Sequence, residues 1–191
     1  MSIFEFISVA ISIILGLAIA RLLSAAIDLI SHRESVTLHW VPLTWAFVMF
    51  SLLVIFWWQL FGANQFREEW TFVDFLLAIA CTVSMYIACG LILPRQWSDY
   101  EIDLYEYFSR DGRWGVAAYS LFYLLVIPYN IRLYGEMATV GVLTLNFSQA
   151  VLSGIAALSR SRLWVGAATV LFLLLYGSNL LAVIFPAFGA E

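Results

Sequence analysis

The sequence predicts an all-α integral membrane protein, a helical bundle of about six transmembrane helices plus one interfacial amphipathic helix. Hydrophobic side chains make up 63% of the 191 residues, charged ones only 12%, and the mean hydropathy is +0.93. A soluble domain carries about 25% charged residues. The apolar residues also gather in long runs, each close to the roughly 20 residues that a spanning helix needs. The chain is therefore expected to form one membrane domain over residues 1–191.

Six apolar runs follow one another along the chain. They cover residues 4–30, 38–62, 71–94, 114–133, 137–158 and 163–187. The fourth run meets Pro128 near its end, and a proline inside a helix removes a hydrogen bond and kinks or breaks the helix. Five and six spans are both compatible with this pattern, and we expect six.

The first run contains two charged residues, Arg21 and Asp28. A charge near the bilayer centre costs at least about 2.5 kcal/mol, so it usually faces a partner or water. The run also carries small or polar side chains at four-residue steps, which let another helix approach closely. This row consists of Ser8, Ser12, Gly16, Ala20, Ser24 and Asp28. We expect this helix to be the packing centre of the bundle, with the row in the contact.

The distribution of arginine predicts the orientation. Six arginines follow the first, third and fifth runs, and two lie on the opposite side. The six are Arg33, Arg95, Arg110, Arg113, Arg160 and Arg162, and the two are Arg67 and Arg132. Basic residues stay preferentially in the cytoplasm, so both termini are expected on the periplasmic side.

The longest polar segment, residues 95–113, predicts the interfacial helix over about 97–109. Aromatic and apolar side chains recur at helical spacing on one face, and acidic ones lie on another. The acidic face carries Asp99, Asp103 and Glu106. It is either a solvated connecting helix or a docking surface for a protein partner on the cytoplasmic side.

Polar residues inside the spans form the candidate site. The fifth run places Asn146, Gln149 and Ser153 on one helical face, the last two near the expected depth of Arg21. Together with Arg21 and Asp28 they are the predicted pathway or polar core. Arg21 would either line a pathway, clamp helices together, or extend its long stem to the inner interface.

Two carboxylates lie one turn inside their spans at the outer end, Glu5 and Asp74. Held close together, they would form a paired site for a proton or cation, because like charges raise the pKa of one carboxyl. The alternative is that both are solvated helix ends.

Other chemistry has little support. No nucleophile, phosphate-binding or metal-ligand motif is present, so an enzyme is the less favoured function and no cofactor or metal is expected. The net charge of −4 argues against a nucleic-acid partner. Cys81 and Cys89 lie about 12 Å apart along one helix, too far to bridge, and are expected to be free thiols.

Residues Phe4 to Ser24, with their Ser-Ile-Ile-Leu-Gly-Leu and Ala-Arg-Leu-Leu segments, resemble the opening of a family of small bacterial multi-pass inner-membrane proteins with no assigned function. The resemblance extends over about half of the chain through His39-Trp40, Phe56-Trp57-Trp58 and Trp70-Thr71-Phe72. It implies a location in the bacterial inner membrane and carries no catalytic or binding residues with it.

Two functions remain on this basis. One is a channel or transporter for an ion or small solute, acting as a homo-oligomer because so small a bundle has little interior for a pathway. The other is a non-transporting scaffold or accessory subunit that docks a partner through the acidic helix.

Overall fold

The protein is an all-α bundle with six helices long and apolar enough to cross a membrane, as the sequence predicts. The computed structural model describes residues 3–66, 70–95, 101–135 and 139–184. The long helices are α1 (Ile3–Ser31), α2 (Trp40–Phe66), α3 (Phe72–Leu91), α5 (Arg113–Tyr134), α6 (Val140–Leu158) and α7 (Arg162–Ile184). Thus the apolar surface left outside the bundle faces a bilayer.

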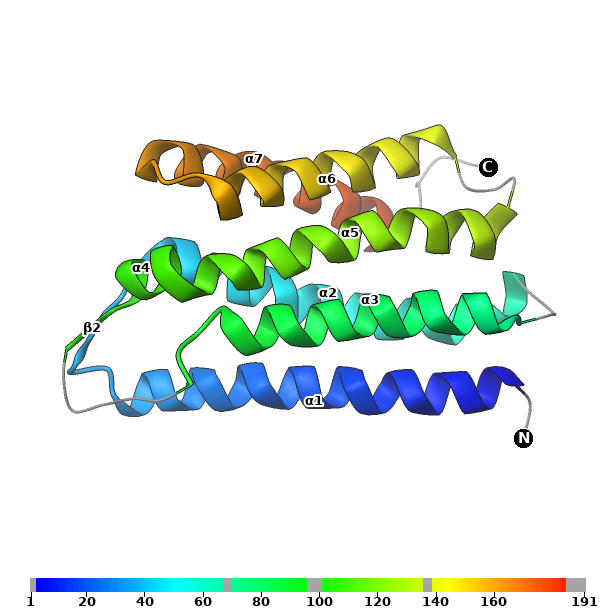
Figure 1. Ribbon diagram of the computed structural model, residues 1–191, viewed down its shortest axis with the longest axis horizontal. Coiled ribbons are helices and arrows are strands. Elements are labelled where there is room, and N and C mark those ends of the chain that lie inside the picture. Colours follow the sequence, from blue (N-terminus) through cyan, green and yellow to red (C-terminus); the bar gives the residue numbers. More distant parts are fainter. Residues whose placement is uncertain (1–2, 67–69, 96–100, 136–138, 185–191) are drawn as a thin grey trace.

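The helices lie side by side in sequential layers (Figure 1). α3 and α5 form the central pair, with α1 on one side of it, α6 and α7 on the other, and α2 behind. The start of α1 and the end of the described part of α7 lie at the same end of the bundle. We call this the terminal end, and the other the loop end.

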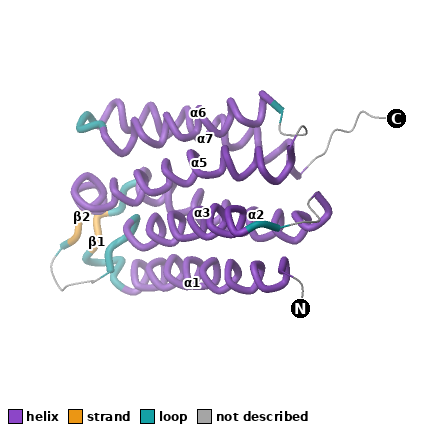
Figure 2. The backbone as a smooth tube through the Cα atoms, turned by 45° about the vertical axis from the view of Figure 1, so that its right-hand side comes forward, coloured by secondary structure: helices purple, strands orange, loops and turns teal. Residues whose placement is uncertain are grey.

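Two short strands tie the connections together at the loop end (Figure 2). β1 (Val36–Thr37) follows α1, and β2 (Ile102–Asp103) precedes the four-residue helix α4 (Leu104–Tyr107). They pair in parallel, with Val36 opposite Ile102, and the Ile102 amide donates to the Ser35 carbonyl at 2.9 Å. The α1–α2 connection is therefore fixed to the segment that leads into α5.

The interfacial helix predicted over 97–109 differs from the structure. Residues 96–100 lie outside the described part, Ile102 and Asp103 are extended, and the helix begins only at Leu104. From there α4 continues through a single π-helical turn, η1 (Phe108–Gly112), into α5. The reason is packing: Leu104, Tyr105 and Phe108 are buried against protein, so this segment extends the fourth span.

The prediction that α1 is the packing centre is wrong. α1 lies at the edge of the bundle (Figure 1), and its buried face is a bulkier row. That row consists of Ile7, Ile11, Leu15, Ala18, Leu22 and Ala25. Gly16, Ala20 and Ser24 are exposed instead, because large aliphatic side chains fill the contact with α3 and α2.

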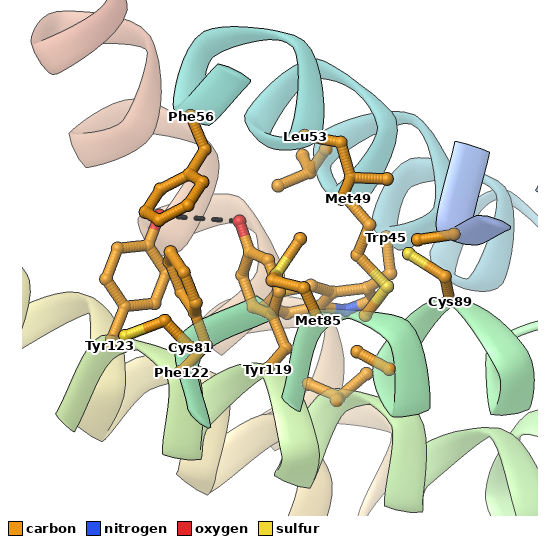
Figure 3. Packing of buried hydrophobic residues seen from close by; sticks show 14 of the residues in the cluster. Trp45, Met49, Leu53, Phe56, Cys81, Met85, Cys89, Tyr119, Phe122 and Tyr123 are labelled. Atoms are coloured by element: carbon orange, nitrogen blue, oxygen red, sulfur yellow. Dashed lines mark hydrogen bonds between the residues drawn. The ribbon is translucent and has the colours of Figure 1, made fainter. Parts of the chain in front are cut away.

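The core is aromatic and lies between α2, α3, α5 and α7. Trp45, Phe56, Tyr119, Phe122 and Phe172 are buried there and pack ring against ring at 4.8–5.8 Å. Figure 3 shows α2 and α3 side chains meeting these rings. The buried Trp45 Nε1–H donates to Thr169 Oγ1 at 3.1 Å, which satisfies both polar groups. This core blocks the middle of the bundle.

Candidate functional site

The buried face of α6 carries the polar residues that the sequence singles out. Thr139 caps the helix, its Oγ1 accepting from the Val142 amide. Asn146 is 6% exposed, and Gln149 and Ser153 are fully buried. α6 packs against α5 and α7, so this face points into the protein and away from lipid.

Two of these side chains have amide atoms without a hydrogen-bond partner among the described residues. Ser153 Oγ donates to the Gln149 carbonyl at 2.6 Å, within its own helix. Within the described part of the chain, Asn146 Nδ2 and both Gln149 amide atoms are buried with no partner. Leaving a buried polar group unpaired costs about 1–3 kcal/mol, so these amides need an explanation beyond packing.

A cavity of about 320 Å³, lined in part by Asn146, lies between α2, α5, α6 and α7 at the terminal end. We call it the neutral pocket. Its polar wall is formed by four amides, Gln59, Asn130, Asn146 and Asn179, and its aromatic wall by Phe56, Phe122, Tyr123, Tyr129, Tyr134 and Tyr176. Aliphatic side chains complete it. None of the described lining residues is ionisable at neutral pH.

The pocket reaches the protein surface at the terminal end. Gln59 is exposed there, and Val142 is 44% exposed. Towards the middle of the bundle the aromatic core closes it, since Tyr119 and Phe122 are at most 2% exposed. Gln149 lies three residues beyond Asn146, about 4.5 Å deeper along α6. The site is a one-ended cavity with the unpaired amide nitrogen of Asn146 in its wall, and it fits the usual composition of a small-molecule pocket.

Arg21 does not belong to this site. Its Nη2 donates to the carbonyls of Leu93 and Pro94, at 3.4 and 3.1 Å, just beyond the end of α3. α1 and α6 lie on opposite sides of the α3–α5 pair (Figures 1 and 2). The expected polar core of five residues is therefore divided, and Arg21 is a clamp between α1 and α3.

Asp28 is likewise separate from the α6 residues. The Asp28 carbonyl accepts the His32 amide at 3.0 Å, and among the described residues its carboxylate makes no ion pair with Arg21 within 4.0 Å. Asp28 lies in the last turns of α1, half-buried. It stands two turns beyond Arg21, which is engaged with α3 instead.

The outer carboxylates have different environments. Asp74 is 3% exposed, and Arg132 of α5 donates to it at 2.6 Å. Its second oxygen accepts the amide and hydroxyl of Thr71, which caps α3. Glu5 is exposed. Asp74 thus serves as a helix-capping residue with a cationic partner, and the structure gives it a role that needs no second carboxylate.

The acidic residues of the predicted docking surface have local roles or lie outside the described part. Asp99 is among the latter. Asp103 caps α4, its Oδ1 accepting from the amides of Tyr105 and Glu106 at 2.7 and 3.0 Å. Glu106 is exposed. Arg162 lies over the Tyr105 ring at 4.6 Å, so the segment contacts α7 through a cation–π pair.

Sequence reasoning missed most of the neutral pocket. Gln59 and Asn130 are amides inside apolar helices, and this rare placement was a usable signal. The tyrosines gave no such signal, because an aromatic side chain in a span is equally common in a plain core. Within the described residues no group of three or more His, Cys, Asp or Glu side chains could hold a metal ion.

Comparison of the chain with protein-family models, curated proteins and solved structures found no match. The class of the protein, an integral membrane helical bundle, therefore rests on its own helices, and its function must be argued from the pocket.

Proposed function

We propose that the protein is a small transporter that binds an uncharged solute in the neutral pocket and carries it across a bacterial inner membrane. The observation that carries this proposal is the buried, unpartnered amide nitrogen of Asn146 on the wall of a cavity whose described lining carries no charge at neutral pH. A solute carbonyl or hydroxyl would supply the missing partner. An amide kept unpaired in the empty site is an expected property of a binding residue, since it discriminates against ligands that cannot pair with it.

The lining favours an uncharged solute over an ion. An ion entering an apolar cavity needs an opposite charge or many oxygen ligands, and the described wall offers amides and aromatic rings instead. A volume of about 320 Å³ suits a small organic molecule. The sequence predicts a pathway past Arg21, and we propose a pathway along α6 instead.

The closed inner end favours a transporter over an open channel. Beyond Asn146, the polar groups of Gln149 and Ser153 continue along α6, but they are fully buried among packed side chains. Passage would therefore require a rearrangement of α6 and α7 against the α3–α5 pair, as in alternating access.

Location and assembly are part of the proposal. Its support is the arginine excess at the loop end, which favours a cytoplasmic loop end, periplasmic termini and a pocket open to the periplasm. A homo-oligomer remains our expectation for a bundle this small, although the pocket lies within one chain. Lipid covers the rest of the apolar surface.

The test uses the substitution Asn146→Leu in protein reconstituted into liposomes, because Asn146 lines the pocket. Stopped-flow light scattering measures the entry of glycerol, urea and benzamide as uncharged probes, beside a potassium flux assay. We expect wild type to admit at least one uncharged probe faster than empty liposomes, and no potassium. Asn146→Leu should reduce that entry at least about tenfold while raising the stability by about 1 kcal/mol, since it removes a buried amide nitrogen that has no partner.

The matched control is Ser148→Ala on the same helix. Ser148 Oγ donates to the Thr144 carbonyl within α6 and does not line the pocket, so both flux and stability should stay near wild type. Wild-type entry no faster than in empty liposomes would contradict the proposal.

The alternative function is a scaffold docked through the acidic segment. Exposed Glu101 and Glu106 favour it, and it would leave the unpaired amides of α6 without a purpose. A scaffold predicts that Asn146→Leu raises stability and that the wild-type protein shows no solute flux.

A further inference from the structure

A second cavity, of about 450 Å³, lies at the loop end of the bundle, between the α4–η1–α5 segment and the α6–α7 connection. Three arginines line it, Arg110, Arg113 and Arg160, together with the hydroxyls of Ser109 and Ser159 and the ring of Trp114. We call it the basic pocket. No acidic residue is among its described lining, in contrast to the mixed charges elsewhere at this end.

The charge of this pocket is only partly neutralised. Arg110 pairs with Asp111 at 2.9 Å. Among the described residues, Arg113 and Arg160 have no carboxylate within 4.0 Å. The Arg113 guanidinium lies 5.3 Å from the centre of the Trp114 ring. A guanidinium that stacks on a ring through its face can still donate hydrogen bonds from the N–H groups at its edge. Two uncompensated guanidinium groups from different segments therefore converge on one cavity.

The surroundings place the basic pocket at the level of lipid headgroups. Trp114 is 55% exposed and Trp164 67% exposed, and tryptophan gathers at the membrane interface. Leu163, at the start of α7, is 85% exposed. The pocket also lies beside the first turn of α7, whose N-terminal amides attract anions. Exposed apolar side chains and the positive charge of the pocket thus lie next to each other. An anionic lipid, which has apolar tails and a charged headgroup, matches both.

We propose that the basic pocket binds a phosphate group between Arg113 and Arg160, and that an anionic phospholipid of the adjoining leaflet supplies it. Guanidinium groups bind phosphate oxygens through paired, charge-assisted hydrogen bonds, and the serine hydroxyls at the rim can add to them. Basic pockets between spanning helices are suited to such headgroups. The bound lipid bridges the start of α5 and the α6–α7 connection, and so stabilises the fold. This site is independent of the neutral pocket.

The test is the thermal melting of purified protein in dodecyl maltoside with added phosphatidylglycerol. We expect phosphatidylglycerol to raise the melting temperature in a saturable way, because a ligand that binds only the folded state stabilises it. Phosphatidylcholine, whose phosphate is already neutralised by its own cation, should have a much smaller effect. Arg160→Gln and Arg113→Gln should each raise the half-saturating lipid concentration by roughly tenfold, the equivalent of one lost charged contact.

Arg33→Gln is the matched control. It removes the same charge at the same end of the bundle, from an exposed arginine 3.9 Å from Glu34 and outside the cavity, so lipid binding should not change. Glycerol 3-phosphate in place of lipid separates the two sources of phosphate: an equal shift supports the same arginine site with a soluble ligand. The proposal is overturned if no phosphate-bearing compound shifts the wild-type melting temperature. It is also overturned if Arg33→Gln weakens binding as much as Arg160→Gln does.

Discussion

At the scale of single residues, Arg21 shows how a charge in an apolar helix can be structural. The carbonyls at the end of α3 have no partner within that helix. Arg21 donates to two of the carbonyls that follow it, of Leu93 and Pro94, and the Tyr107 hydroxyl donates to those of Leu91 and Leu93 at 3.0 and 3.2 Å. A cation is also favourable at the negative end of a helix dipole. Arg21 thus fixes the segment that follows α3 to α1, while the Tyr107 hydroxyl satisfies the last carbonyl of α3 itself.

We expect Arg21→Gln to lower the free energy of unfolding by about 1.5–3 kcal/mol, the range for hydrogen bonds to a charged group. Solute entry should be unchanged, because Arg21 does not line the neutral pocket. A melting curve and the flux assay measure the two effects separately. Arg33→Gln, on the exposed connection, should change neither. A loss of flux with unchanged stability would show instead that Arg21 lines the transport pathway.

The Arg132–Asp74 pair joins α5 to the cap of α3, and its partners should be energetically coupled. We expect Arg132→Gln and Asp74→Asn each to destabilise the protein, and the double variant to cost less than the sum. A coupling energy of about 1–3 kcal/mol is expected for contacting charges, since Asp74 is buried and the distance is 2.6 Å. Melting curves of the four proteins provide the cycle. Additive effects would mean that the two residues act independently.

At the scale of elements, the contact between α3 and α5 depends on a glycine. A Cβ at Gly115 would lie 2.8 Å from the Ala88 carbonyl and 3.0 Å from the Ile92 amide, both backbone atoms. We expect Gly115→Ala to force the two helices apart and to destabilise the protein by about 1–3 kcal/mol, as overpacking does. Thermal melting in detergent measures this.

Gly16→Ala in α1 is the control for that substitution, because nothing lies within 4 Å of a Cβ there. It should be neutral or slightly stabilising, since alanine has the higher helix propensity. Equal destabilisation at both positions would show that α1 uses its small-residue row in a contact with another chain.

Apolar runs were sufficient to predict the six helices, because a bilayer requires long uninterrupted apolar helices. The faces of those helices were not predictable in the same way. Lipid is as apolar as leucine, so nothing in the composition of α1 distinguishes the row of Ile11 and Leu15 from the row of Gly16 and Ala20. On α6 the buried face was found, since Asn146 and Gln149 would be costly in lipid. The partners of Arg21 are two backbone carbonyls, which no residue pattern reveals.

At the scale of the whole molecule, the two pockets lie at opposite ends of the bundle and follow its orientation. The neutral pocket lies where α5 ends and α6 begins, between α2, α5, α6 and α7. The basic pocket lies between the start of α5 and the α6–α7 connection. With the loop end in the cytoplasm, the first opens to the periplasm and the second faces the inner leaflet, where anionic lipid supplies phosphate. The reverse orientation would separate the basic pocket from that leaflet.

Cysteine accessibility tests this orientation. Glu34 is 92% exposed at the loop end and Val140 80% exposed at the start of α6, so a thiol at either position can react. The background lacks the buried Cys81 and Cys89. In intact cells an impermeant maleimide should label Val140→Cys and leave Glu34→Cys unlabelled, because the proposed orientation, based on the arginine excess, places the loop end inside. After permeabilisation both should label, which confirms that each thiol is reactive. Labelling of Glu34→Cys alone in intact cells would show that the topology is the reverse, with the neutral pocket on the cytoplasmic side.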